Sequence, residues 1–308
     1  MSTATPPTQD RPLLGIALML GFCAVIPFAD ALAKLLGEDF PLMQLILVRF
    51  LAQSILFAPV ALAMGAALFP STRVLGLTIA RTLLQIAGLL LMFSALRVLP
   101  LADAVAIAFV MPFIMLILGH FILHEEVGPR RLAACAVGFV GTLMVVQPSF
   151  AAVGWAALLP VGVAFVFAFF MLVTRAMAKE IAPMALQGAS GLLALPLVAP
   201  LAFLPVSMET PLVGWIAPMG AEIWLFLALG LFGSLGHLLM TWSLRFAPSA
   251  TLAPMQYLEI PLATLVGFAM FGDLPNGLAT AGIAVTIASG LYIVARERNQ
   301  ARRVQDPA

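Results

Sequence analysis

The chain has 308 residues, of which 63% are hydrophobic and only 9% are charged, and its formal net charge is +1. An ordinary soluble domain is about 45–50% apolar and about 25% charged, so this chain lacks the polar residues that would cover a water-facing surface. The composition excludes a soluble enzyme, a nucleic-acid-binding protein and a disordered protein as descriptions of the whole chain. It predicts a polytopic membrane protein.

Ten apolar segments are long enough, or nearly long enough, to cross a bilayer as helices, which takes about 20 residues. Turn-forming proline and glycine residues separate them, and most connections are only a few residues long. The predicted spans are 13–33, 42–65, 74–96, 101–123, 131–147, 152–174, 183–204, 223–244, 249–271 and 277–295. We therefore expect an all-α integral membrane protein with ten transmembrane helices and no soluble catalytic domain.

Lysine and arginine residues indicate the orientation, because they concentrate in cytoplasmic loops. With the N-terminus in the cytoplasm, eleven of the fifteen lie on the cytoplasmic side, two lie outside and two lie within spans. The sequence predicts a multi-pass protein of the inner membrane with both termini cytoplasmic. Residues 1–12 and 297–308 are the predicted tails.

An internal repeat divides the chain. Residues 94–126 and 243–274 share a Leu-Arg pair, a proline turn, and a helix broken near its middle by Pro112 or Pro261. Each copy ends in an apolar run followed by an acidic residue, and a glycine-bearing helix follows each copy. The repeats are predicted to cover 13–148 and 152–296, with five helices each.

Five is an odd number, so the second half is predicted to be inverted in the membrane relative to the first. Two inverted five-helix repeats are the architecture of transporters that work by alternating access. In that architecture the substrate site lies between the halves, near the middle of the bilayer.

Several segments resemble the drug/metabolite transporter superfamily in its ten-helix form, which is built from two EamA domains. The matching residues are Arg49-Phe50, Leu96-Arg97 with Pro100 and Ala102-Asp103-Ala104, Ala253 to Pro275, and Ser289 to Arg298. The second half is most similar to the branch that contains S-adenosylmethionine uptake carriers. The resemblance implies transport of a small organic molecule, while members of the superfamily differ widely in substrate.

Charged residues within the spans are candidates for the substrate site, since each costs about 2.5–3.5 kcal/mol at a helix centre on insertion scales. Glu259 lies near the middle of its span, and Gln256 and Tyr257 share its segment. One interpretation is that Glu259 binds a cationic group or takes up a proton. The alternative is a protonated glutamate hydrogen-bonded between helices.

Arg49 and Asp30 lie in the second and first spans. The guanidinium fork of Arg49 matches a carboxylate, so direct contact with substrate is one interpretation, and Asp30 is a second candidate for substrate contact. The structural alternative is a salt bridge between the two residues that holds their helices together.

Three further residues complete the candidate site: Arg81, His237 and Trp242. Arg81 has three interpretations: it lines the transport path, it pairs with another residue inside the protein, or its long side chain snorkels to the lipid headgroups. His237 is either a hydrogen-bonded core residue or a group that couples transport to protons. Phe109, Phe167 and Phe169 are candidates for lining the pocket, and the sequence does not choose among them.

Motifs for catalysis and cofactor binding are missing from the sequence. It has no nucleotide-binding loop, Ser-His-Asp set or zinc-peptidase helix, and His120 and His124 lack a third metal ligand at suitable spacing. We therefore expect no enzyme activity, no metal and no cofactor. The expected partners are a small-molecule substrate and the lipid bilayer, with no nucleic acid. Small residues in the closing helix of each half suit a homodimer contact.

Together these features predict a secondary transporter of small organic metabolites. Amino acids or their derivatives are the favoured substrates, with Arg49 for a carboxylate and Glu259 for an ammonium group. The alternatives are an S-adenosylmethionine-type uptake exchanger and a flippase-like exporter of drugs or lipid precursors.

Overall fold

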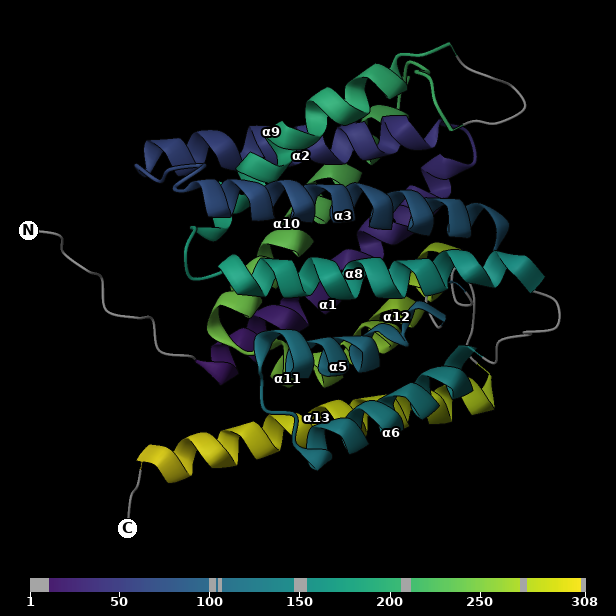
Figure 1. Cartoon of the computed structure of the whole chain (residues 1–308). Helices are drawn as coiled ribbons and strands as arrows, with labels where there is room; N and C mark the ends of the chain where they lie inside the picture. Colours follow the sequence, from purple (N-terminus) through teal and green to yellow (C-terminus); the bar gives the residue numbers. More distant parts are fainter. Residues whose placement is uncertain are drawn as a thin grey trace, which may run out of the picture.

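The computed structural model describes residues 11–99, 104, 107–146, 154–205, 212–271 and 276–305. Within those ranges every regular element is a helix (Figure 1). The elements are α1 Pro12–Gly37, α2 Leu42–Ala63, α3 Thr72–Val98, α5 Met111–Leu123, α6 Pro129–Val146, η1 Gly154–Ala157, α8 Leu158–Met177, α9 Pro183–Ala202, α10 Glu222–Phe246, α11 Ser249–Leu252, η2 Ala253–Leu258, α12 Glu259–Phe271 and α13 Gly277–Gln305.

Seven of the described helices are long and apolar enough to cross a membrane: α1, α2, α3, α8, α9, α10 and the first 20 residues of α13. The predicted span 131–147 corresponds to α6, which is not among the seven. The predicted span 101–123 lies partly outside the described residues, and its described part ends in the shorter apolar helix α5. The described helices therefore suit a multi-pass membrane protein.

The predicted span 249–271 is not one continuous helix, and its break precedes Pro261. It consists of α11, the 3-10 segment η2 and α12, which begins at Glu259. Pro261 thus lies in the first turn of α12, where the missing N–H of proline costs no helical hydrogen bond. Pro112 likewise lies in the first turn of α5, directly after a turn at residues 109–110. Both prolines follow a break and begin the next helix.

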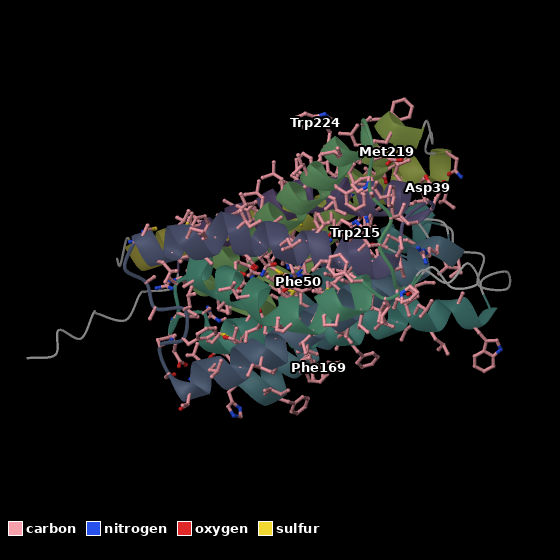
Figure 2. All side chains as sticks on the ribbon, turned by 90° about the horizontal axis from the view of Figure 1, so that it is seen from above. Asp39, Phe50, Phe169, Trp215, Met219 and Trp224 are labelled. Carbon is pink, nitrogen blue, oxygen red and sulfur yellow. The ribbon has the colours of Figure 1, made fainter. Side chains whose placement is uncertain are left out.

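Large apolar side chains cover the outer surface of the helices. Trp224 is 72% exposed and projects from the surface, whereas Phe50 is fully buried between helices (Figure 2). Other exposed apolar side chains on the long helices include Ile55, Leu62, Leu83, Leu197, Leu227 and Leu291. A soluble monomer rarely exposes a continuous apolar surface of this extent, so this surface suits contact with lipid.

The helices pack in four principal pairs: α1 with α10, α3 with α8, α2 with α9 and α6 with α13. Glycines make two of these contacts close. A Cβ atom added at Gly188 of α9 would lie 2.7 Å from the Cα of Ala58 in α2, and Gly141 of α6 lies directly against Gly282 and Thr286 of α13. In lipid, small residues at the contact allow helix backbones to approach and gain dispersion energy.

The first residues of α1 and the last residues of α13 lie on one side of the molecule, on the left of Figure 1. There α1 begins and α13 ends, α3 and α9 begin, and α8 and α10 end. We call this the termini side. It carries bonds between distant segments: the hydroxyl of Ser243 donates to the carbonyl of Gly15 at 2.7 Å, and Arg73 forms an ion pair with Glu180.

Candidate functional site

A cavity of about 110 Å³ lies among the helices. This volume is below the range of about 300–1,000 Å³ that is common for small-molecule sites, so a metabolite can occupy the cavity only when the surrounding helices or side chains move apart. Residues of α1, α2, α3, α5, α8, α10 and α12 line it, together with the segment before α5. The cavity therefore lies between the two sequence halves. Its lining residues are Phe22, Ile26, Asp30, Arg49, Leu84, Gln85, Gly88, Leu89, Met92, Ala108, Phe109, Met111, Val163, Phe167, Phe170, His237 and Glu259.

Aromatic rings form much of the apolar wall. Phe22 stacks on Phe167 with ring centres 6.5 Å apart, and Phe167 lies 5.4 Å from Phe170. Phe109 contributes a further ring from the segment before α5. Such a wall offers flat apolar faces on which another ring system can stack.

Arg49 brings a buried positive charge to this wall. Its side chain is 4% exposed, and its Nη2 atom has no hydrogen-bond partner among the described residues. Gly233 of α10 makes room for the guanidinium, because a Cβ atom added there would lie 2.6 Å from the Nε of Arg49. A buried donor without a partner is costly, so Arg49 favours a ligand that brings an oxygen acceptor.

Two acidic residues, Asp30 and Glu259, line the same cavity as Arg49. Asp30 and Arg49 interact electrostatically, but no ion pair within 4.0 Å joins them among the described residues, so the salt bridge between α1 and α2 remains a prediction. Both residues line the cavity. Glu259 is the first residue of α12 and follows the 3-10 segment η2 without a gap. The change from 3-10 to α-helix thus coincides with a carboxyl group at the cavity.

His237 reaches the cavity from α10. Its ring contacts Phe170 edge-on, with 5.6 Å between centres, and its Nδ1 atom is buried without a hydrogen-bond partner in the described part of the chain. This arrangement differs from that of a hydrogen-bonded core histidine. A neutral imidazole in this position has one nitrogen available to a ligand.

Four of the eight candidate residues do not line the cavity: Arg81, Gln256, Tyr257 and Trp242. Arg81 is fully buried among polar side chains, so it does not snorkel to the headgroups. The amide nitrogen of Gln256 lies 2.9 Å from the sulfur of Met171, and Trp242 is half-buried on α10. Tyr257 donates a hydrogen bond of 3.2 Å to the carbonyl of Phe109, and it therefore helps to position a residue of the wall.

Several lining residues were not identified from sequence, notably Phe22, Gly88 and Phe170. Phe167 and Phe170 are three residues apart on α8 and so share a helix face, which is the signal that a search for helical spacing would detect. Phe169 lies on another face: it is 39% exposed and points away from the interior (Figure 2). No cluster of three or more potential metal ligands occurs among the described residues.

Comparison with known proteins agrees with these observations. A riboflavin transporter of Rhizobium johnstonii is 31% identical over 74% of this chain and 72% of its own length. A riboflavin transporter of Vibrio cholerae is 26% identical over 97% of this chain and 99% of its own length. An S-adenosylmethionine uptake transporter of Rickettsia prowazekii is 24% identical over 93% of this chain and 94% of its own length.

A solved crystal structure shares the fold. It superposes with a TM-score of 0.71 at 20% identity, covering 93% of this chain and 98% of the other. The model of the EamA-like transporter family matches residues 13–147 and again residues 154–295. The protein is thus a multi-pass membrane transporter for a small molecule rather than an enzyme, and it belongs to the EamA-like transporter family.

Proposed function

We propose that this protein imports a metabolite with a planar heteroaromatic ring, riboflavin first, across the inner membrane. The observation that carries the proposal is the aromatic wall of Phe22, Phe109, Phe167 and Phe170. The same cavity holds the guanidinium of Arg49, whose Nη2 atom has no hydrogen-bond partner among the described residues. Flat rings stack on such a wall, and the ring carbonyls of a flavin are acceptors for Arg49. The relatives named as riboflavin transporters support this substrate.

The polar residues of the cavity suit the rest of the molecule. Riboflavin carries a chain of hydroxyl groups, which both donate and accept hydrogen bonds. Asp30, Gln85, His237 and Glu259 line the cavity and offer acceptors and donors for such a chain. An aliphatic amino acid has no ring to stack on the aromatic wall, and none of the relatives above is named for amino-acid transport. We therefore favour a flavin over the amino acids expected from sequence.

Helix packing supports the predicted inverted repeat and alternating access. When the two halves are exchanged, α1 corresponds to α8, α2 to α9, α3 to α10 and α6 to α13. The pair α1–α10 then corresponds to α8–α3, which is also a principal pair, while α2–α9 and α6–α13 each correspond to themselves. This exchange is what an approximate two-fold axis between inverted halves requires.

The distribution of basic residues supports a cytoplasmic termini side. Arg73, Arg130, Arg175 and Arg245 lie at helix ends on that side. Lysine and arginine accumulate in cytoplasmic loops, so the cavity is expected to exchange substrate between the outside and the side that carries the termini.

Counterflow in proteoliposomes tests the substrate. Vesicles loaded with unlabelled riboflavin, S-adenosylmethionine or mixed amino acids are offered the corresponding labelled compound, with protein-free vesicles as the control. Saturable accumulation of riboflavin supports the proposal. Accumulation of S-adenosylmethionine alone would favour the second candidate, and accumulation of amino acids alone would contradict both.

S-adenosylmethionine is the second candidate because of the two acids in the cavity, and Glu259→Gln separates the two substrates. The sulfonium and ammonium groups of S-adenosylmethionine are positive, so a carboxylate at residue 259 stabilises them, whereas riboflavin is neutral. If the second candidate is transported, Glu259→Gln should raise its KM about tenfold, since a hydrogen bond to a charged group contributes about 1.5–3 kcal/mol. The KM for riboflavin should change less than threefold.

The matched control is Glu180→Gln, which removes an acid from the surface ion pair with Arg73. It should leave the KM for each substrate unchanged, since exposed ion pairs contribute little to stability. An equal rise in KM for both substrates in Glu259→Gln would show that Glu259 does not recognise a cation.

A further inference from the structure

Arg81, which does not line the cavity, is the centre of a buried polar cluster. Its Nε donates a hydrogen bond of 3.0 Å to the hydroxyl of Thr174. One terminal nitrogen donates to Ser190 at 2.7 Å and to Gln85 at 3.4 Å, and the other donates to Thr241 at 3.5 Å. All these side chains are buried. One residue of α3 therefore holds α8, α9 and α10, which belong to the other half of the sequence.

Glutamine side chains extend the cluster. Gln85 donates to Gln53 at 3.2 Å, and Gln53 donates to the carbonyl of Gln187 at 2.8 Å. Gln187 in turn donates to Thr241 and to the carbonyl of His237, both at 2.7 Å. The bonds thus cross between α2, α3, α9 and α10. We call Arg81, Thr174, Ser190, Thr241, Gln85, Gln53 and Gln187 the Arg81 cluster.

The cluster lies between the cavity and the termini side. Gln85 lines the cavity and accepts from Arg81, and Phe170 lines the cavity while its ring centre lies 4.5 Å from the guanidinium carbon. Helices α8 and α10 end on the termini side, and Thr174 and Thr241 lie in their last two turns. Helix α9 begins on that side, and Ser190 lies in its first half. The cluster is thus placed between the cavity and the termini side.

The chemistry of the cluster suits a contact that opens and closes. Arg81 has no carboxylate within 4.0 Å among the described residues, and its partners are neutral hydroxyl and amide oxygens. When the helices separate, water molecules can replace these oxygens as acceptors for Arg81. Opening therefore breaks no buried ion pair, which would cost more free energy. While the halves are together, one guanidinium orients three helices at once.

We propose that the Arg81 cluster is the gate that closes the cavity on the termini side. Opening separates α3 from α8, α9 and α10, and Arg81 then gives up its bonds to Thr174, Ser190 and Thr241. The proposal rests on alternating access in the proposed function. It adds the residues that hold the closed state.

Cysteine accessibility tests the gate without any substrate. Thr78 of α3 is fully buried one turn closer to the termini side, where its hydroxyl lies 3.8 Å from the sulfur of Met177 in α8. Thr78→Cys is made in the full chain with Cys23 and Cys135 replaced by alanine. A membrane-impermeant maleimide is then applied to each side of vesicles of both orientations.

Arg81→Ala should speed labelling of the cysteine at position 78 about tenfold or more from the termini side, because the bonds from this charged donor stabilise the closed state. The double variant Ser190→Ala with Thr241→Val removes two acceptors and keeps the charge. It should speed labelling by a smaller factor, and it carries the test if Arg81→Ala does not fold.

The matched control is Arg97→Ala, which removes an arginine bonded to the carbonyls of Gly37 and Phe40 at the opposite side. It should leave the termini-side rate unchanged. Equal rates in the parent, Arg81→Ala and the double variant would overturn the gate. Because the assay uses no substrate, that result would leave the proposed substrate standing, whereas faster labelling without riboflavin transport would refute the substrate and retain the gate.

Discussion

Replacing Arg49 with glutamine should lower the kcat/KM of riboflavin uptake by about tenfold to a hundredfold. The substitution removes a buried charge whose Nη2 atom has no protein partner among the described residues, so the lost contact is the one made with substrate. A hydrogen bond from a charged donor contributes about 1.5–3 kcal/mol, which gives the expected range. The measurement is initial uptake of labelled riboflavin into proteoliposomes over a range of concentrations.

Two companion variants distinguish the geometry of Arg49 from its charge. Arg49→Lys retains the positive charge but lacks the paired donors of the guanidinium, so its uptake should lie between that of Arg49→Gln and that of the wild type. Gly233→Ala retains Arg49 but places a Cβ atom 2.6 Å from its Nε, so the guanidinium must move and the KM should rise. Arg73→Gln, at an exposed ion pair, is the control and should transport normally. Wild-type uptake by both Arg49→Gln and Arg49→Lys would exclude Arg49 from substrate binding.

Gly188→Ala should destabilise the folded protein by about 1–3 kcal/mol, the usual cost of overpacking a close contact. The new Cβ atom would lie 2.7 Å from the backbone of Ala58, and a backbone cannot rotate away as a side chain can, so α2 and α9 must separate. Since this pair corresponds to itself when the halves are exchanged, the loss affects both halves. Thermal unfolding of the purified protein in detergent, followed by circular dichroism, gives the change in Tm.

Gly76→Ala is the matched control for this prediction. Gly76 lies in α3 with no atom within 4 Å of an added Cβ, and alanine is favoured over glycine in a helix by about 1 kcal/mol. Its Tm should therefore stay the same or rise slightly. Equal Tm values for Gly188→Ala and Gly76→Ala would mean that the α2–α9 contact does not depend on the glycine.

Some of the candidate site could be predicted because charge is conspicuous in an apolar sequence. Asp30, Arg49, His237 and Glu259 were singled out since each is polar or charged within a span, and all four line the cavity. The same criterion also selected Arg81, whose guanidinium is enclosed by hydroxyl and amide groups from three other helices. Burial cost identifies an unusual residue, but it does not distinguish a ligand site from a contact between helices.

The aromatic wall could not be predicted in the same way. Phe167, Phe169 and Phe170 are chemically alike, yet two line the cavity and Phe169 points outward. A helix that is apolar on all sides has no polar stripe from which its inward face can be read, because lipid accepts the same side chains as the interior. The apolar character of α8 therefore does not show by itself which of these three rings faces the cavity.

Composition and the length of the apolar segments are enough to identify the class of this protein: an all-helical membrane protein with a repeated pattern and a few charged residues within its spans. Water excludes such segments, and lipid requires their backbones to form helices. The three-dimensional fold was needed to show that Gly233 makes room for Arg49 and that Arg81 lies outside the cavity. The physical reason is that these relations depend on contacts between segments far apart in sequence, which local patterns of hydrophobicity and charge do not encode.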